Sequence, residues 1–96
     1  MELRFQWDPK KARRNLAKHG VSFEEAQTVF FDSFVGIDPD PDHSDEEERL
    51  FSIGRSDAGR LLVVIYTETR ETDFVLIRII SSRRATRAER QAYEED

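Results

Sequence analysis

The chain has 96 residues, with 15 Lys and Arg against 20 Asp and Glu, so its formal net charge at neutral pH is −5. This length suits one small domain, and residues 1–96 are expected to form a single one. A sequence without cysteine excludes disulfides, thiolate catalysis and thiolate metal sites. The longest apolar run, Leu61–Tyr66, is too short to cross a bilayer, and Met1–Arg4 lacks the apolar region of a secretory signal. We therefore expect a cytoplasmic protein with no membrane partner.

Charge is unevenly distributed along the sequence. Residues 1–20 contain six basic and two acidic residues, whereas residues 21–50 contain one basic and ten acidic residues. A second basic segment runs from Arg78 to Arg90, with five arginines and one glutamate. A phosphate responds to the local field, so an RNA-binding surface is compatible with the acidic net charge. The acidic middle is equally compatible with a basic protein partner.

The N-terminal third is expected to form a strand and two helices. Residues 3–7 alternate apolar and polar, which is typical of a half-buried strand. The pair Asp8-Pro9 supplies an N-cap and a first helical residue, and Gly20 is suited to end that helix. A second helix begins at Ser22, because Ser22 and Glu25 have the spacing of a capping box.

The rest of the sequence predicts a meander of strands followed by a helix. The prolines of Asp38–Asp42 exclude a central strand, so residues 33–48 are expected to be a connection or a sheet edge. Strands joined by short polar turns are expected at residues 49–55, 60–68 and 73–81. A last helix starts at Thr86, which forms a capping box with Glu89. The expected fold class is α+β, with helices packed on one face of a twisted antiparallel sheet.

Four stretches of the sequence occur together, in this order, in one protein family. The stretches are Phe5–Asp8, Lys18–Ala26, Asp40–Ser44, and Arg78–Thr86 with Glu89, Arg90 and Tyr93. On these residues the chain resembles the BrnT toxins of bacterial type II toxin–antitoxin systems, over essentially its whole length.

The resemblance implies a RelE-like fold with two N-terminal helices and a C-terminal helix. It implies a metal-independent endoribonuclease that requires no cofactor and inhibits translation by cleaving RNA. It also implies a partner, an antitoxin similar to BrnA. The ribbon-helix-helix part of such an antitoxin dimerises and binds DNA, so the toxin would meet DNA only through it.

Cleavage of RNA by its own 2′-OH requires a base, positive charge at the phosphorane and an acid. Glu68 is the preferred base because it ends the most apolar strand, and Arg78 on the next strand is its preferred cationic neighbour. Both positions are even, so they share a sheet face only if the hairpin between them closes around an odd number of residues. The alternative for Glu68 is a solvated charge at the end of a strand.

Arginines near the last helix are the strongest physical signal for RNA binding, because guanidinium groups match phosphate oxygens in pairs. Arg83 and Arg55 are expected to act with Glu68 and Arg78 in catalysis. The residues expected to bind substrate in this region are Arg84, Arg87, Arg90 and Tyr93, the last three as a stripe on one helix face. The alternative is that Arg90 pairs with Glu94 and that Tyr93 packs on the sheet.

Lys18 and His19, at the end of the first helix, are a second candidate substrate-binding pair. A helix C-terminus favours positive charge, so His19 either contacts substrate or caps the helix. Lys18 either adds charge near a phosphate or is an exposed helix lysine. His43, in the acidic connection, is expected to be a surface residue. No metal site is expected, since the segment after Asp38 lacks the Gly and Glu of a calcium loop.

Two alternatives to a ribonuclease stay open. The first is a non-catalytic module that partners a DNA-binding regulator through its acidic surface. The second, direct DNA binding, is less favoured because the first helix offers only Asn15 to read base edges.

Overall fold

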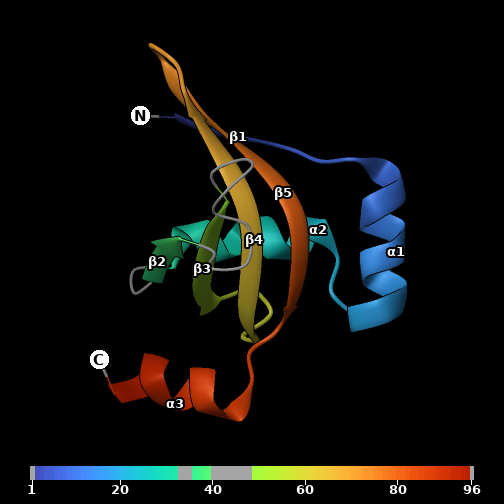
Figure 1. Ribbon diagram of the computed structural model, residues 1–96, viewed down its shortest axis with the longest axis vertical. Coiled ribbons are helices and arrows are strands. Elements are labelled where there is room, and N and C mark those ends of the chain that lie inside the picture. The colour runs from blue at the N-terminus through green and yellow to red at the C-terminus, as the bar shows by residue number, and fades with distance from the viewer. Residues whose placement is uncertain (1, 33–35, 40–48, 96) are drawn as a thin grey trace.

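The computed structural model describes residues 2–32, 36–39 and 49–95. Five strands form one sheet in the order β1-β5-β4-β3-β2 (Figure 1). The strands are β1 (Glu2–Gln6), β2 (Gly36–Pro39), β3 (Leu50–Arg55), β4 (Leu61–Arg70) and β5 (Phe74–Arg84). The helices are α1 (Pro9–His19), α2 (Phe23–Gln27), the 3₁₀ helix η1 (Thr28–Phe31) and α3 (Arg87–Glu95). The predicted α+β class, with two helices before the meander and one after it, is confirmed.

Strands β2 to β5 form the predicted antiparallel meander, whereas β1 pairs with β5 in parallel. The parallel pair differs from the wholly antiparallel sheet that the sequence predicted. The prediction rested on short hairpins, which force neighbouring strands to reverse direction. No hairpin joins β1 to β5, because the helices and the rest of the sheet separate them in sequence. The direction of β1 is therefore free of that constraint.

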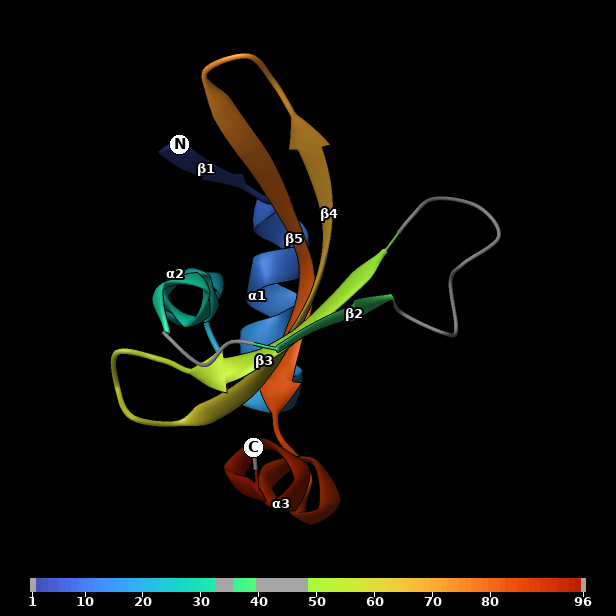
Figure 2. The ribbon, with the colours of Figure 1, turned by 90° about the vertical axis from the view of Figure 1, so that its left-hand side faces the viewer.

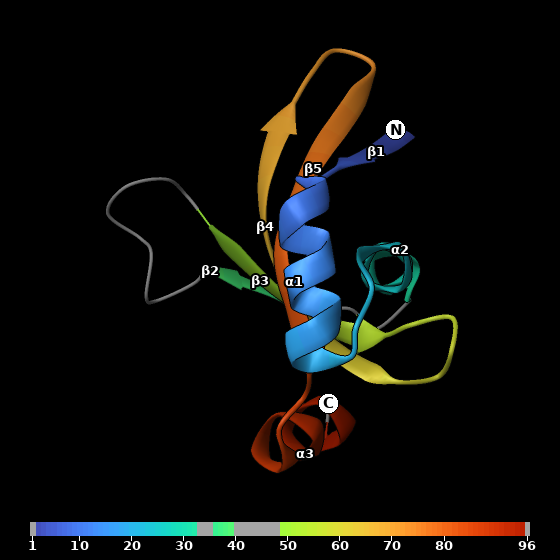
Figure 3. The same cartoon turned by 90° about the vertical axis from the view of Figure 1, so that its right-hand side faces the viewer.

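The hydrophobic core lies between the sheet and the layer formed by α2 and η1 (Figures 2 and 3). Alternate residues of β4 and β5 point into it, among them Leu62, Val64 and Ile77. Phe23 of α2 is fully buried against them. We call the sheet face that points away from this layer the open face; α3 lies at one end of it (Figure 2).

Local capping explains where the first two helices begin and end. The Asp8 carboxylate accepts from the Lys10 amide at 2.8 Å, and α1 ends at Gly20 with φ of 70°, as predicted. The Ser22 hydroxyl accepts from the Glu25 amide at 3.0 Å, which confirms the predicted start of α2. This helix is shorter than a regular one, because the Thr28 hydroxyl donates to the Glu25 carbonyl and the chain tightens into η1.

Asn15 closes the part of β5 that β1 does not reach. Strand β1 pairs only with residues 74–78, which leaves the lower half of β5 as an edge. The Asn15 amide donates to the Ser82 carbonyl at 2.8 Å and accepts from the Ser82 amide at 3.1 Å, so the side chain acts like a neighbouring strand. It also donates to the Val21 carbonyl at 2.9 Å. Asn15 is buried and fixes α1 beside the sheet.

Candidate nucleic-acid interface

A bulge in β5 decides which side chains reach the open face. Ile65 pairs with Ser81, but the next residue of β4, Tyr66, pairs with Ile79, so Ile80 is an extra residue in β5. An inserted residue reverses the alternation of side chains beyond it. Below the bulge Arg83 lies opposite Val63. Beyond the bulge, towards the hairpin, all partners are shifted by one.

The predicted pairing of Glu68 with Arg78 is wrong. Glu68 lies opposite Ile77 and on the core side of β4, whereas Arg78 lies opposite Thr67 on the open face. Extending the register of Val63 and Arg83 without the bulge would have set Glu68 directly opposite Arg78. A shared face required an odd number of residues in the hairpin, but four residues lie between Arg70 and its partner Val75. Glu68 is exposed and lies 3.7 Å from Arg70, as a strand-end charge.

Three of the predicted catalytic residues do share one face. Arg55 lies opposite Leu61, Arg78 opposite Thr67 and Arg83 opposite Val63. These three partners are all odd-numbered residues of β4, so they point to the same face of the sheet. All three guanidinium groups therefore belong to the open face. None of the β4 residues opposite these arginines is a carboxylate. A face of this kind favours an anionic ligand.

Arg83 is held by Glu89 at the start of α3. Its Nη1 and Nη2 donate to the two carboxylate oxygens at 2.7 and 2.9 Å. Glu89 also accepts from the Thr86 amide at 2.8 Å and its own amide donates to the Thr86 hydroxyl at 3.1 Å, so the predicted capping box is confirmed. These bonds, led by those from Arg83, lower the pKa of Glu89 to about 2. Among the described residues nothing accepts from Nε of Arg83, so one edge of its guanidinium is available to an oxyanion.

Arg55 at the end of β3 and Tyr93 of α3 lie close to each other. Arg55 Nη2 donates to Glu94 at 3.2 Å, and its guanidinium carbon lies 5.9 Å from the centre of the Tyr93 ring. The Tyr93 hydroxyl donates to the Asp32 carboxylate at 2.6 Å. Burial, and then Asp32, raise the pKa of Tyr93 to about 12. The Tyr93 hydroxyl thus attaches α3 to the domain.

The predicted stripe of Arg87, Arg90 and Tyr93 lies within α3, and two of its members contact carboxylates of the protein itself. Arg90 lies 3.6 Å from Glu94, which is the alternative that the sequence left open. Arg87 is exposed at the start of α3. Arg84 lies opposite Leu62 on the core side of the sheet, where its charge contributes to lowering the pKa of Glu25 after the larger effect of Arg60. Arg84 is therefore separated from Arg83 by the sheet.

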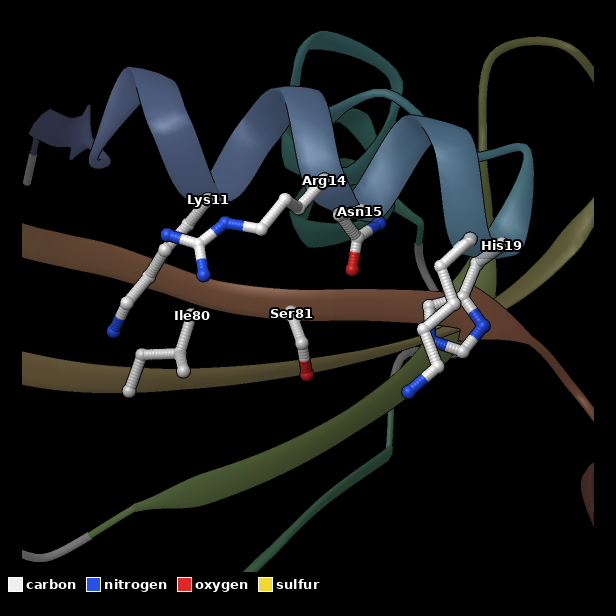
Figure 4. Close-up of a pocket in the computed structure, with 7 residues that line it drawn as sticks. Lys11, Arg14, Asn15, His19, Ile80 and Ser81 are labelled. Atoms are coloured by element: carbon white, nitrogen blue, oxygen red, sulfur yellow. The ribbon is translucent and has the colours of Figure 1, made fainter.

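A groove runs between α1 and the open side of β5 (Figure 4). Helix α1 contributes Lys11, Arg14, Lys18 and His19 to its walls, and β5 contributes Ile80 and Ser81. Figure 4 shows Lys11 reaching from the helix towards Ile80, and Arg14 extending along the helix towards Lys11. The predicted pair of Lys18 and His19 is thus placed in one concave site. Lys11 and Arg14 were missed, although their spacing from Lys18 marks one helix face.

Two further observations concern metals and membranes. Among residues 2–32, 36–39 and 49–95 no group of three or more His, Asp or Glu is arranged to hold a metal ion. None of the described helices is long and apolar enough to cross a bilayer. His43 and the acidic stretch around it lie outside the described residues.

Comparison with known proteins gives a family and a fold. The sequence model of the family described as "Ribonuclease toxin, BrnT, of type II toxin-antitoxin system" matches residues 7–89. Among solved structures, the chain is similar to the crystal structure of the Brucella abortus ribonuclease toxin BrnT. The TM-score is 0.65 at 22% sequence identity, over 91% of this chain and 100% of that one. A search of curated proteins found no match. Because the family match spans most of the sequence and the fold agrees, the chain belongs to the BrnT family of ribonuclease toxins of type II toxin–antitoxin systems.

Proposed function

We propose that the protein is a metal-independent endoribonuclease that cleaves RNA by attack of a 2′-OH on the adjacent phosphate. The observation that carries this proposal is the shared face of Arg55, Arg78 and Arg83, created by the bulge at Ile80. Guanidinium groups supply the positive charge that the phosphorane requires, and a metal ion is then not needed for that purpose. The family of the chain supports RNA as the substrate.

Arg83 has the geometry to bind a phosphate at the reacting centre. Two hydrogen bonds to the Glu89 carboxylate hold the guanidinium in one orientation. These bonds use the edge formed by Nη1 and Nη2, a geometry that matches the oxygens of an oxyanion. The remaining edge consists of Nε–H and the second N–H of Nη2, and among the described residues it donates to no acceptor. We assign that edge to a non-bridging phosphate oxygen. Arg55, at the same end, adds charge, and Arg78 binds a phosphate farther along the open face.

His19 is the group that we assign to proton transfer. It lies one helical turn beyond Asn15, whose side chain is bonded to Ser82, so the imidazole sits where the groove approaches Arg83. One imidazole nitrogen can accept a proton and the other can donate one, which suits both the base and the acid of this reaction. Glu68 is on the opposite face and roughly 16 Å along the strand from the level of Arg83, so it is not part of this site.

The family supports the cellular role that we propose. RNA cleavage inhibits translation, and an antitoxin similar to BrnA neutralises the toxin. The ribbon-helix-helix part of that antitoxin binds DNA, and the toxin contacts DNA only through the antitoxin. The family name, which places the chain in a type II toxin–antitoxin system, supports a protein antitoxin as partner.

A matched pair of variants tests the role of Arg83. Arg83→Ala removes the guanidinium and its ion pair, whereas Glu89→Gln removes the same ion pair but keeps the guanidinium. With a fluorescently labelled single-stranded RNA, we expect Arg83→Ala to lower kcat/KM by about 10²- to 10³-fold. Glu89→Gln keeps the guanidinium but loses the carboxylate that orients it, so it should lower kcat/KM much less than Arg83→Ala does. Equal losses in both variants would show that Arg83 acts only by holding α3.

The competing function, a non-catalytic partner of a DNA-binding regulator, makes a different prediction in growing cells. A ribonuclease loses its toxicity when Arg83 or His19 is replaced. A binding module does not depend on either group, so growth inhibition would persist in His19→Gln. His19 is only half-buried, so this variant is expected to fold.

A further inference from the structure

Helix α1 carries a set of cations that the protein itself does not neutralise. Most arginines elsewhere in the described chain are within 4 Å of a carboxylate, as in the pairs of Arg60 with Glu25 and Arg83 with Glu89. Lys11, Arg14 and Lys18 have no such partner among the described residues. The helix itself contains no acidic residue. This is unusual in a chain whose net charge is −5.

The three cations lie on one face of the helix and point into the same groove. Their spacings of three and four residues place like charges next to each other, which disfavours the free helix and is relieved by an anion. Lys18 lies seven positions after Lys11, so the charges extend over about 10 Å of helix. A stacked nucleic-acid strand advances about 3.4 Å per nucleotide, so this distance corresponds to about three phosphates.

We propose that the groove between α1 and β5 binds the sugar–phosphate backbone of single-stranded RNA through Lys11, Arg14 and Lys18. This inference rests on the proposed function and extends it, because it assigns the path that the substrate takes to the arginines of the open face. The backbone lies along the groove, with the nucleotide nearest His19 closest to Arg83.

The opposite wall of the groove fits the same ligand. Ile80, the extra residue of the bulge, gives an apolar surface that a ribose or a base can contact, and the Ser81 hydroxyl is a hydrogen-bond donor and acceptor for RNA hydroxyl groups. Among the residues that the structure describes, none of the side chains lining the groove is acidic. The groove is also continuous with the open face, because Ser81 and Arg83 are alternate residues of β5. An acidic protein segment could bind the cations of the groove, but only a substrate RNA needs to continue from the groove to the arginines of the open face.

Two double variants of α1 provide a matched test. Lys11→Gln with Arg14→Gln removes two cations from the groove, and Lys10→Gln with Arg13→Gln removes two from elsewhere on the helix. The four residues are exposed, the changes in composition and net charge are identical, and glutamine is a good helix former. The probe is a 2′-O-methyl RNA of about 12 nucleotides, which the enzyme cannot cleave. Fluorescence anisotropy then gives Kd at several salt concentrations.

We expect the groove variant to bind this probe about 10- to 30-fold more weakly at moderate salt, and the slope of log Kd against log salt to fall by about 1 to 1.5. The control variant should change Kd by less than about threefold. Equal losses in the two variants would overturn the groove assignment and leave a general electrostatic effect. Unchanged RNA binding with weakened neutralisation by the antitoxin would also overturn it, in favour of a protein-binding surface.

The proposed function and the groove fail in different ways. If the parent protein neither binds nor cleaves RNA, the proposed function is wrong and the groove proposal falls with it. If Arg83→Ala abolishes cleavage while the groove variant binds and cleaves as the control does, the ribonuclease stands and the groove proposal alone is rejected. Thermal melting of both double variants, expected to agree within a few degrees, confirms that the comparison is between folded proteins.

Discussion

Arg78 and Arg83 lie on the same face of β5 although five positions separate them. A regular strand would place them on opposite faces, because its side chains alternate. The extra residue Ile80 reverses the alternation between the two, so Arg78 becomes exposed on the open face while Ile77 and Ile79 stay in the core. The bulge therefore assembles the cationic face without removing an apolar side chain from the core.

We predict that Glu68→Gln leaves RNA cleavage within about twofold of the parent value. The bulge sets Glu68 on the core side of β4, away from the arginine face, and its carboxylate is exposed at the end of the strand. Initial rates on a labelled RNA at saturating and limiting concentrations check this. A loss comparable with that of Arg83→Ala would mean that the general base lies on the face we have excluded.

Acid stability depends on Glu89. Its pKa in the folded protein is about 2, below the ordinary value of a glutamate, chiefly because Arg83 hydrogen-bonds to its charged form. A lowered pKa contributes stability that is present above the unfolded-state pKa and is lost as the pH falls towards 2. The carboxylate is partly exposed, so we expect a contribution of about 1–2 kcal/mol. Urea unfolding between pH 5 and 2 should show a smaller loss in Glu89→Gln than in the parent protein.

Tyr93 makes the corresponding prediction at alkaline pH. Its pKa is raised to about 12, by burial and by the nearby Asp32. A raised pKa means that the stability contributed by the neutral phenol is complete below about pH 10 and is lost as the pH rises through 12. Tyr93→Phe lacks both the hydrogen bond and this ionisation, so its α3 should be less protected than in the parent protein below pH 10, and its protection should change less above pH 10. Amide hydrogen exchange in residues 87–95 reports the dissociation; an unchanged pH profile would contradict the contact with Asp32.

Asn15→Ala should destabilise the domain by about 2–4 kcal/mol, because three hydrogen bonds are lost and the backbone groups of Ser82 are left without partners in a buried place. Asn15→Asp is the matched control: it keeps one acceptor but repels the carbonyl groups that the amide served. Asn15→Ala should expose the Ser82 amide to hydrogen exchange, whereas Asn15→Asp keeps the oxygen that accepts from this amide and should leave it better protected. Protection of that amide in Asn15→Ala would show that α1 is held beside β5 by other contacts.

Elements fixed by local chemistry were predictable from the sequence. The start of α1 at Asp8, its end at Gly20 and the Thr86–Glu89 capping box involve residues within four positions of one another. The α+β class followed from the order of such elements. The residues of the α1 groove were half predictable, since Lys18 and His19 were identified and the helical spacing of Lys11 and Arg14 would have completed the set.

The parts that failed depend on contacts between distant residues. No local signal marks Ile80 as a bulge, because isoleucine is an ordinary strand residue, and the parity rule for Glu68 and Arg78 assumed an uninterrupted strand. The parallel pairing of β1 likewise depends on where α1 docks, which Asn15 and Ser82 settle across 67 positions. The contact of Tyr93 with Asp32 likewise could not be predicted, because the two residues lie 61 positions apart.

Digestion of bulk RNA by the purified chain in excess EDTA, with the product ends mapped, tests the central claim most directly. The account predicts short products that end in 2′,3′-cyclic phosphate, formed at an unchanged rate when magnesium is added back. Cleavage that requires added metal ion and leaves 3′-hydroxyl ends would contradict the mechanism, since water and not the 2′-OH would then be the attacking group.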